Sequence, residues 1–189
     1  MTKLLLQSLL SLLVFTVLTG LVYPLAVTGI AALCCARAAG GSLISVKGQL
    51  VGSDLIGQPF DQPRYFWPRP SATTPQPYNG LASGGSNLGP TNPAQIDAVQ
   101  ARIAALQKID PDNVLPIPVD LVTASGSGLD PDISLAAAQY QLARVARVRG
   151  LSPQSVAELI AAHTRLRQWG LFGEPRVNVL ELNLALDGP

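Results

Sequence analysis

The chain has 189 residues with 13 basic and 12 acidic side chains, one histidine and a formal net charge of +1. A chain this close to neutrality lacks the basic excess that polyanions attract, which argues against nucleic acid as its main partner. The length suits one membrane anchor followed by one compact domain of about 150 residues.

The first predicted element is an uncharged apolar run from Leu4 to Ala36. As one helix this run would measure about 50 Å, against a hydrocarbon core of about 30 Å. The apolar core of a signal peptide is shorter, roughly 7 to 15 residues. We therefore predict a short cytoplasmic tip and a single transmembrane helix over residues 1–36, with an extramembrane domain over residues 37–189.

One face of this helix carries small or kinking residues at every fourth position. They are Thr16, Gly20, Pro24, Thr28 and Ala32. Helices in lipid associate by close backbone approach at small residues, so we expect this face to bind a partner helix. Such residues are also simply common in membrane spans, and both readings stay open. Pro24 lacks a backbone donor and is expected to bend the helix.

Charge near the two ends of the span gives a weak signal of its orientation. The amino terminus and Lys3 favour a cytoplasmic N-terminus, whereas Arg37 and Lys47 flank the other end. We expect the N-terminus on the cytoplasmic side of the membrane and the domain on the outer side. The adjacent Cys34 and Cys35 leave no cysteine for a disulfide or thiolate metal site in the domain, and their role stays open.

The domain starts with a predicted hairpin over residues 42–51, followed by a long Pro/Gly-rich stretch. Residues 59–93 contain eight prolines and four glycines. Five aromatic residues interrupt this stretch, namely Phe60, Tyr65, Phe66, Trp67 and Tyr78. Because aromatic side chains give a loop something to pack with, we predict an ordered loop that carries recognition.

Helices and strands alternate in the remainder. Asn92-Pro93 begins a predicted helix that stops before Pro111, and residues 117–123 are predicted as a strand. Ser134 caps a second helix that ends at Gly150, and Ser152-Pro153 starts a third that ends near Trp169-Gly170. A closing strand is predicted over residues 177–186. The expected fold is an α+β (mixed α/β) domain behind one transmembrane helix.

Catalytic and metal-binding groups are sparse. His163, the only histidine, falls on the apolar face of a predicted helix, which favours a packed or hydrogen-bonded role. Asp130 and Asp132 favour turn and capping chemistry over a cation site, and we expect no metal. Ser83-Gly84-Gly85 could offer backbone N–H groups to an anion, although no P-loop is present. The three arginines Arg144, Arg147 and Arg149 predict a basic patch that complements a helix dipole.

Several long runs then resemble one family, KdpC, the C subunit of bacterial Kdp-type potassium-transporting ATPases. They are Tyr65-Phe66-Trp67-Pro68-Arg69-Pro70-Ser71-Ala72, residues 83–93 (SGGSNLGPTNP), residues 118–131 (PVDLVTASGSGLDP) and residues 177–187 (VNVLELNLALD). The likeness covers nearly the whole chain, including the single span.

The resemblance implies an accessory subunit beside a channel-like potassium-binding subunit, a P-type ATPase subunit and a small single-span subunit. It also implies a catalytic chaperone that raises the ATP affinity of the ATPase subunit, with Gln141, Ser83, Gly84 and Gly85 near nucleotide. No tightly bound cofactor is expected, and ATP is the one ligand implied. We expect partner contacts from the anchor face and from loop residues, namely Tyr65, Phe66, Arg69 and Asn87.

Two features of the sequence do not fit the implied contact with ATP. A domain outside the membrane does not meet ATP, so Gln141 would need another role. The chain also lacks the Asp-Lys-Thr-Gly motif that P-type ATPases phosphorylate. The alternative functions are a membrane-anchored envelope hydrolase, which would need a reactive serine, and a pilin-like filament protein, which usually carries an early glutamate in its long helix.

Overall fold

The computed structural model describes residues 1–188 and divides the chain into two compact units, Met1–Leu43 and a second unit that begins at Ile44. Each unit is described by itself. The second is a mixed helix and sheet domain, as the sequence predicts.

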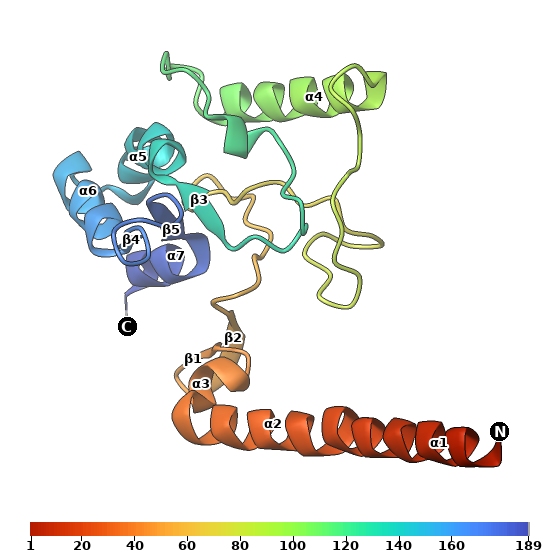
Figure 1. Ribbon diagram of the computed structural model, residues 1–189. Coiled ribbons are helices and arrows are strands. Elements are labelled where there is room, and N and C mark those ends of the chain that lie inside the picture. Colours follow the sequence, from red (N-terminus) through yellow and green to blue (C-terminus); the bar gives the residue numbers. More distant parts are fainter. Residues whose placement is uncertain (189) are drawn as a thin grey trace. The chain divides into compact units, whose positions relative to one another are not determined.

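The first unit is one long helical stretch, Thr2–Cys34, which is long and apolar enough to cross a membrane. It contains α1 (Thr2–Val17), a π-helical segment (Leu18–Val22) and α2 (Tyr23–Cys34), and a short α3 (Ala36–Ala39) follows. The π-helical segment lies just before Pro24, whose ring would clash with the carbonyl of Gly20 in a regular helix. Pro24 is expected to bend the helix; the structure has a π-helical segment there instead, and Figure 1 shows no sharp kink.

The domain begins with the predicted hairpin, formed by β1 (Leu43–Val46) and β2 (Gln49–Ser53). Lys47 and Gly48 at its turn both have positive φ, which is the backbone of a tight hairpin turn. The chain then runs without a helix or an extended strand to α4 (Pro93–Ile109), as predicted for residues 59–93 (Figure 1). Asn92 caps α4 by accepting a hydrogen bond from the N–H of Ala94.

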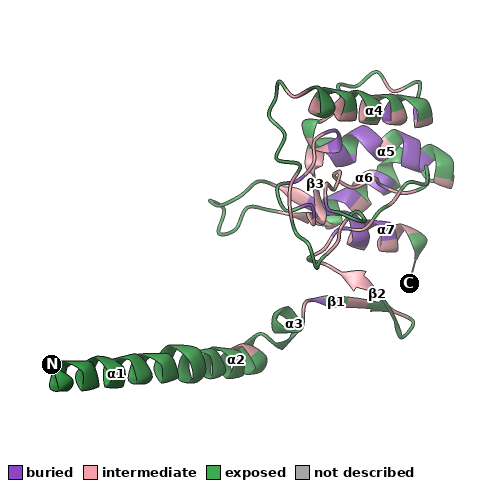
Figure 2. Ribbon diagram, turned by 90° about the vertical axis from the view of Figure 1, so that its right-hand side faces the viewer, coloured by how far each residue is buried: buried purple, intermediate pink, exposed green. Residues whose placement is uncertain are grey.

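The sheet has three short antiparallel strands in the order β3-β5-β4. They are β3 (Asp132–Ser134), β4 (Thr164–Arg165) and β5 (Arg176–Asn178). Val177 lies at the centre, opposite Ile133 on one side and Thr164 on the other. Helices α5 (Leu135–Arg149), α6 (Pro153–Ala162) and α7 (Val179–Asp187) complete the domain. Figure 2 shows the buried residues gathered on these helices.

Three sequence predictions about secondary structure are wrong. Residues 117–123 form a 3-10 turn (Val119–Leu121), because Pro116 and Pro118 lack the donors a strand needs. The third helix ends at Ala162, where the chain turns into β4. Residues 177–186 form a short strand and then α7, because the Asn178 side chain accepts from the N–H of Glu181 and starts a helix there.

The domain core joins the sheet and helices to the long loop. Phe66, from the loop, is fully buried with Ile133, Val145, Val177 and Leu182. A loop residue at the centre of the core means that the loop folds with the domain rather than over it.

Candidate functional site

Two side-chain amides hold the backbone of two consecutive loop residues. Asn183 on α7 accepts from the N–H of Phe66 at 2.8 Å through Oδ1, and its Nδ2 donates to the Phe66 carbonyl at 3.0 Å. Gln141 on α5 treats Trp67 in the same way: Oε1 accepts from its N–H at 2.7 Å, and Nε2 donates to its carbonyl at 3.1 Å. We call these four residues the amide clamp.

The clamp replaces the strand pairing that this segment cannot make. Prolines at 63, 68 and 70 remove backbone donors on either side, so a continuous ladder is not available. A primary amide offers one donor face and one acceptor, which match the N–H and C=O of a single extended residue. Gln141 and Asn183 are each only 1 % exposed, so water cannot take over these hydrogen bonds.

Arg144 stabilises the clamp through hydrogen bonds to Gln141 and to the loop backbone. It donates to Gln141 Oε1 at 2.7 Å and to the carbonyl of Tyr65 at 3.0 Å, and it also bonds the Pro63 carbonyl. Its guanidinium lies 5.7 Å from the centre of the Trp67 ring. Burial lowers the pKa of Arg144 to about 10, and the guanidinium still carries its charge at neutral pH.

The predicted basic patch on α5 is therefore wrong as a surface feature. Arg144 is buried, and Arg147 pairs with the buried Asp110 at 2.6 Å. Arg149 binds the carbonyls of Arg64 and Leu186 and pairs with Asp187 at 2.8 Å. All three arginines face partners from other segments, which their spacing along the helix could not reveal.

Asp187 ties the start of the loop to the end of α7. It accepts hydrogen bonds of 2.8 Å from Arg149, Arg64 and the hydroxyl of Tyr65. Burial alone would raise the pKa of Asp187, but these three hydrogen bonds outweigh that effect and lower the pKa. The guanidinium groups of Arg64 and Arg149 also lie over the Tyr65 ring, with their Cζ atoms 4.9 Å and 5.0 Å from the ring centre. The contacts of Tyr65 are thus largely within the chain.

The Ser83-Gly84-Gly85 segment lies against a second glycine-rich segment, residues 126–128. The hydroxyl of Ser83 and the N–H of Gly84 both donate to the Ser127 carbonyl, at 3.0 and 2.8 Å. A Cβ on Gly128, where φ is +67°, would lie 2.6 Å from the Gly84 carbonyl. Glycine here allows two backbones to touch, which accounts for the motif without an anion.

The four residues predicted for nucleotide contact therefore bind different segments of the domain. Gln141 holds Trp67, Ser83 and Gly84 donate to the Ser127 carbonyl, and Gly85 lies against the backbone of Gly126. The structure gives each a packing role, and nucleotide contact stays a prediction.

The residues predicted for partner contact differ in exposure. Phe66 is fully buried, so its side chain belongs to the core. Arg69 is partly buried and pairs with Asp130 at 3.2 Å. Asn87 is exposed in the left-handed region, with φ of 54°. The anchor residues Thr16, Gly20, Pro24 and Thr28 are all exposed on the helix of the first unit.

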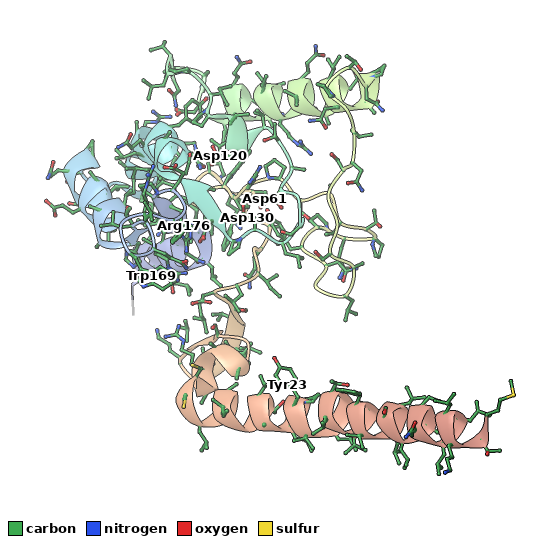
Figure 3. All side chains as sticks on the ribbon, viewed as in Figure 1. Tyr23, Asp61, Asp120, Asp130, Trp169 and Arg176 are labelled. Atoms are coloured by element: carbon green, nitrogen blue, oxygen red, sulfur yellow. The ribbon has the colours of Figure 1, made fainter. Side chains whose placement is uncertain are left out.

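Asp130, Asp132 and His163 each make a contact within the domain. Asp130 accepts from the N–H of Asp132, which pairs in turn with Arg176 at 2.8 Å. Figure 3 labels Asp120, Asp130 and Arg176, which line one hollow of about 330 Å³. His163 follows the last residue of α6, and its Nδ1 lies 2.9 Å from the Leu159 carbonyl, which agrees with the hydrogen-bonded role predicted for it. Among residues 1–188 there is no group of three or more His, Cys, Asp or Glu that could hold a metal ion.

Sequence reasoning missed Asn183, Arg144 and Asp187 as members of the site. Asn183 is a polar residue within an apolar run, VNVLELNLAL, and a buried polar residue in such a run needs a partner. That signal could have pointed to Asn183. Nothing local marked Arg144 or Asp187, because the loop groups that they bind lie far away in sequence.

Comparison with known proteins accounts for the whole chain. Residues 5–188 match the family model described as KdpC: K+-transporting ATPase, c chain. A potassium-transporting ATPase KdpC subunit of Polynucleobacter asymbioticus is 63% identical over 92% of this chain and 92% of its own length. That of Variovorax paradoxus is 65% identical over 90% of this chain and 88% of its own, and that of Methylibium petroleiphilum is 61% identical over 100% and 98%.

Proposed function

The chain belongs to the KdpC family of K+-transporting ATPase subunits, and we propose that it acts as an anchored, non-hydrolysing subunit of a potassium pump. The single observation that carries this proposal is the match over residues 5–188, which spans both the apolar helix and the domain. The partners are a channel-like potassium-binding subunit, a P-type ATPase subunit and a small single-span subunit in a bacterial inner membrane.

The residues of the domain support a role without chemistry of its own. The serine and histidine that a hydrolase would recruit are engaged elsewhere: Ser83 donates to Ser127, and His163 contacts the carbonyl of Leu159. A nucleophile needs a base within hydrogen-bond reach and a third group that orients the base. The Ser83 and His163 side chains lie within hydrogen-bond distance of main-chain carbonyls and not of each other. This favours the role of a non-hydrolysing subunit over that of an envelope hydrolase.

The anchor helix is the part of the chain that joins the pump within the membrane. All of its residues from Thr2 to Leu33, apart from the partly buried Ala31, are exposed in the isolated chain. The face marked by Thr16, Gly20 and Thr28 has the small groups that let another helix approach closely. The N-terminus lies in the cytoplasm and the domain on the periplasmic or extracellular side.

In this proposal the chain raises the ATP affinity of the ATPase subunit without touching nucleotide through Gln141. Support comes from the amide clamp, because both polar atoms of the Gln141 side chain are already bonded to Trp67 and the side chain is 1 % exposed. Gln141 contributes by fixing the loop over residues 59–93, and the loop surface, including Asn87, meets the pump.

The test is potassium-stimulated ATP hydrolysis by the purified pump, assembled with and without this chain. The chain alone is expected to release no phosphate, and the pump is expected to lose stimulated hydrolysis without it and regain it on addition. Phosphate release by the isolated chain, or an unchanged rate in a pump that lacks it, would overturn the proposal.

A further inference from the structure

The loop between β4 and β5 carries the densest group of exposed apolar side chains in the described part of the domain. Leu166, Trp169, Leu171 and Phe172 are 73%, 90%, 71% and 55% exposed. Figure 3 labels Trp169 on this loop. Single exposed apolar residues are ordinary, but four within seven positions mark a contact surface.

Four backbone N–H groups of this loop donate to carbonyls within the loop. The N–H of Leu171 donates to the Gln168 carbonyl at 3.0 Å, and the N–H of Gln168 donates to the Phe172 carbonyl at 2.8 Å. Phe172 and Gly170 donate to Gln168 and Arg167 in the same turn. Trp169 and Gly170 both have positive φ, which places the indole at the tip of a tight turn. Each hydrogen bond made within the turn lowers the cost of moving the loop out of water.

The charged residues beside this loop do not oppose its transfer from water to an apolar environment. Arg167 pairs with Glu174 at 2.6 Å, and Arg165 pairs with Glu181 at 2.9 Å. No acidic residue lies between Arg165 and Gly173. Tryptophan and long basic side chains are the residues that membrane interfaces favour, because each has an apolar body and a polar end.

A short linker joins the domain to the helix that can span the membrane. The helix that can span the membrane ends at Cys34, and β1 begins at Leu43. The eight residues between them reach at most about 29 Å when fully extended. Whatever arrangement the two units take, the domain therefore meets the lipid surface at a high effective concentration.

We propose that the tip loop, Leu166–Gly173, inserts into the interfacial region of the bilayer that holds the chain's own helix, with Trp169 deepest. The inference goes beyond the role in the pump and rests only on the membrane span. A lipid surface fits the tip better than a protein groove, since the apolar groups protrude from one turn that is closed by its own backbone hydrogen bonds.

The experiment uses the full chain in phosphatidylcholine nanodiscs. Only Trp67 and Trp169 are tryptophans, so Trp67→Phe leaves Trp169 as the sole reporter and retains the backbone that the clamp holds. Phospholipid brominated near the headgroup is expected to lower Trp169 emission about twofold, whereas aqueous iodide has little effect.

The control places the reporter at another exposed apolar position. Val114 is 94% exposed in a different loop, so the matched chain carries Val114→Trp with Trp67→Phe and Trp169→Phe. Iodide should quench this reporter and brominated lipid should not. Equal lipid quenching at both positions would overturn the proposal. The proposal would also be overturned if iodide quenched Trp169 in the isolated chain and stopped doing so only after assembly with the pump. That result would mean that Trp169 contacts a protein subunit. Because the isolated chain is measured, failure here leaves the pump assay unaffected.

Discussion

Gln141 binds Trp67 through both ends of its amide, with distances of 2.7 Å to the backbone N–H and 3.1 Å to the carbonyl. The pair joins α5 to a loop residue 74 positions earlier in the chain. Asn183 repeats the arrangement one residue away, on Phe66. A proline-rich loop thereby gains the fixed backbone that a strand would have obtained from its neighbours.

Removing the Gln141 amide should destabilise the domain. Gln141→Ala leaves a buried N–H and C=O of Trp67 without partners, and we expect a loss of about 2 to 3 kcal/mol in the free energy of unfolding. Chemical denaturation of the full chain in detergent measures it. The matched control is Gln139→Ala, two residues away on the exposed side of α5, which should change stability by less than about 0.5 kcal/mol. Equal effects of the two substitutions would refute the clamp.

The two amides should act together. Because Gln141 and Asn183 hold adjacent residues of one segment, losing either loosens what the other binds. The double variant Gln141→Ala, Asn183→Ala should therefore lose less free energy of unfolding than the two single variants lose in sum. The difference, which is the coupling energy, should be about 1 kcal/mol. A double-mutant cycle by denaturation gives this coupling, and strict additivity would mean that the two contacts are independent.

The glycine contact between residues 83–85 and 126–128 should tolerate a methyl group at Gly126 but not at Gly128. Gly128→Ala places a Cβ 2.5 Å from Thr73 and 2.6 Å from the Gly84 carbonyl, at positive φ, and should cost about 2 kcal/mol. Gly126→Ala meets nothing within 4 Å and is the control, expected within about 0.5 kcal/mol of the parent. Protease cleavage within residues 59–93 should rise for Gly128→Ala alone, and resistance there would count against the packing.

The Asp187 cluster predicts a defined pH dependence. Hydrogen bonds from Arg149, Tyr65 and Arg64 outweigh burial and lower the pKa of Asp187 below its ordinary 3.8. Its stabilisation is thus complete above pH 4 and is lost as the pH falls through the lowered pKa. Asp187→Asn should cost about 1 kcal/mol at pH 7, a modest value because the carboxylate is 34% exposed and water screens its ion pairs.

The measurement is the free energy of unfolding of the parent chain and of Asp187→Asn at several pH values. The gap between the two should narrow as the pH falls below 4 and close at lower pH. A gap that stays constant with pH would show that the carboxylate charge contributes nothing.

Much of the fold follows from local sequence rules. The apolar run, the hairpin turn at Lys47-Gly48, and the caps Asn92, Ser134 and Gly150 each depend on a few neighbouring residues, and the structure has them where predicted. The strand predicted over residues 177–186 failed because apolar residues there suit either a strand or a buried helix, and only the cap at Asn178 distinguishes the two.

The site was harder to predict for a physical reason. The partners of Gln141 and Asn183 lie 74 and 117 positions away, and each contact is to backbone, which carries no residue identity. The loop was correctly predicted to be ordered from its aromatic residues, yet Phe66 is a core residue and not a surface one. Exposure within a loop depends on tertiary packing, which composition does not encode.

In the proposed function, one face of the membrane helix holds this chain in the pump. Gly20 lies on the small-residue face, and Gly29 lies about two and a half turns further along, on the opposite face of an ideal helix. A Cβ added at either meets nothing within 4 Å, so both positions accept leucine in the isolated chain.

The decisive measurement is the amount of pump that co-purifies with the full chain carrying Gly20→Leu or Gly29→Leu. We predict that Gly20→Leu reduces recovery about tenfold, because leucine blocks close helix approach, and that Gly29→Leu recovers the pump like the parent. Full recovery with Gly20→Leu, or equal loss with both substitutions, would contradict the account.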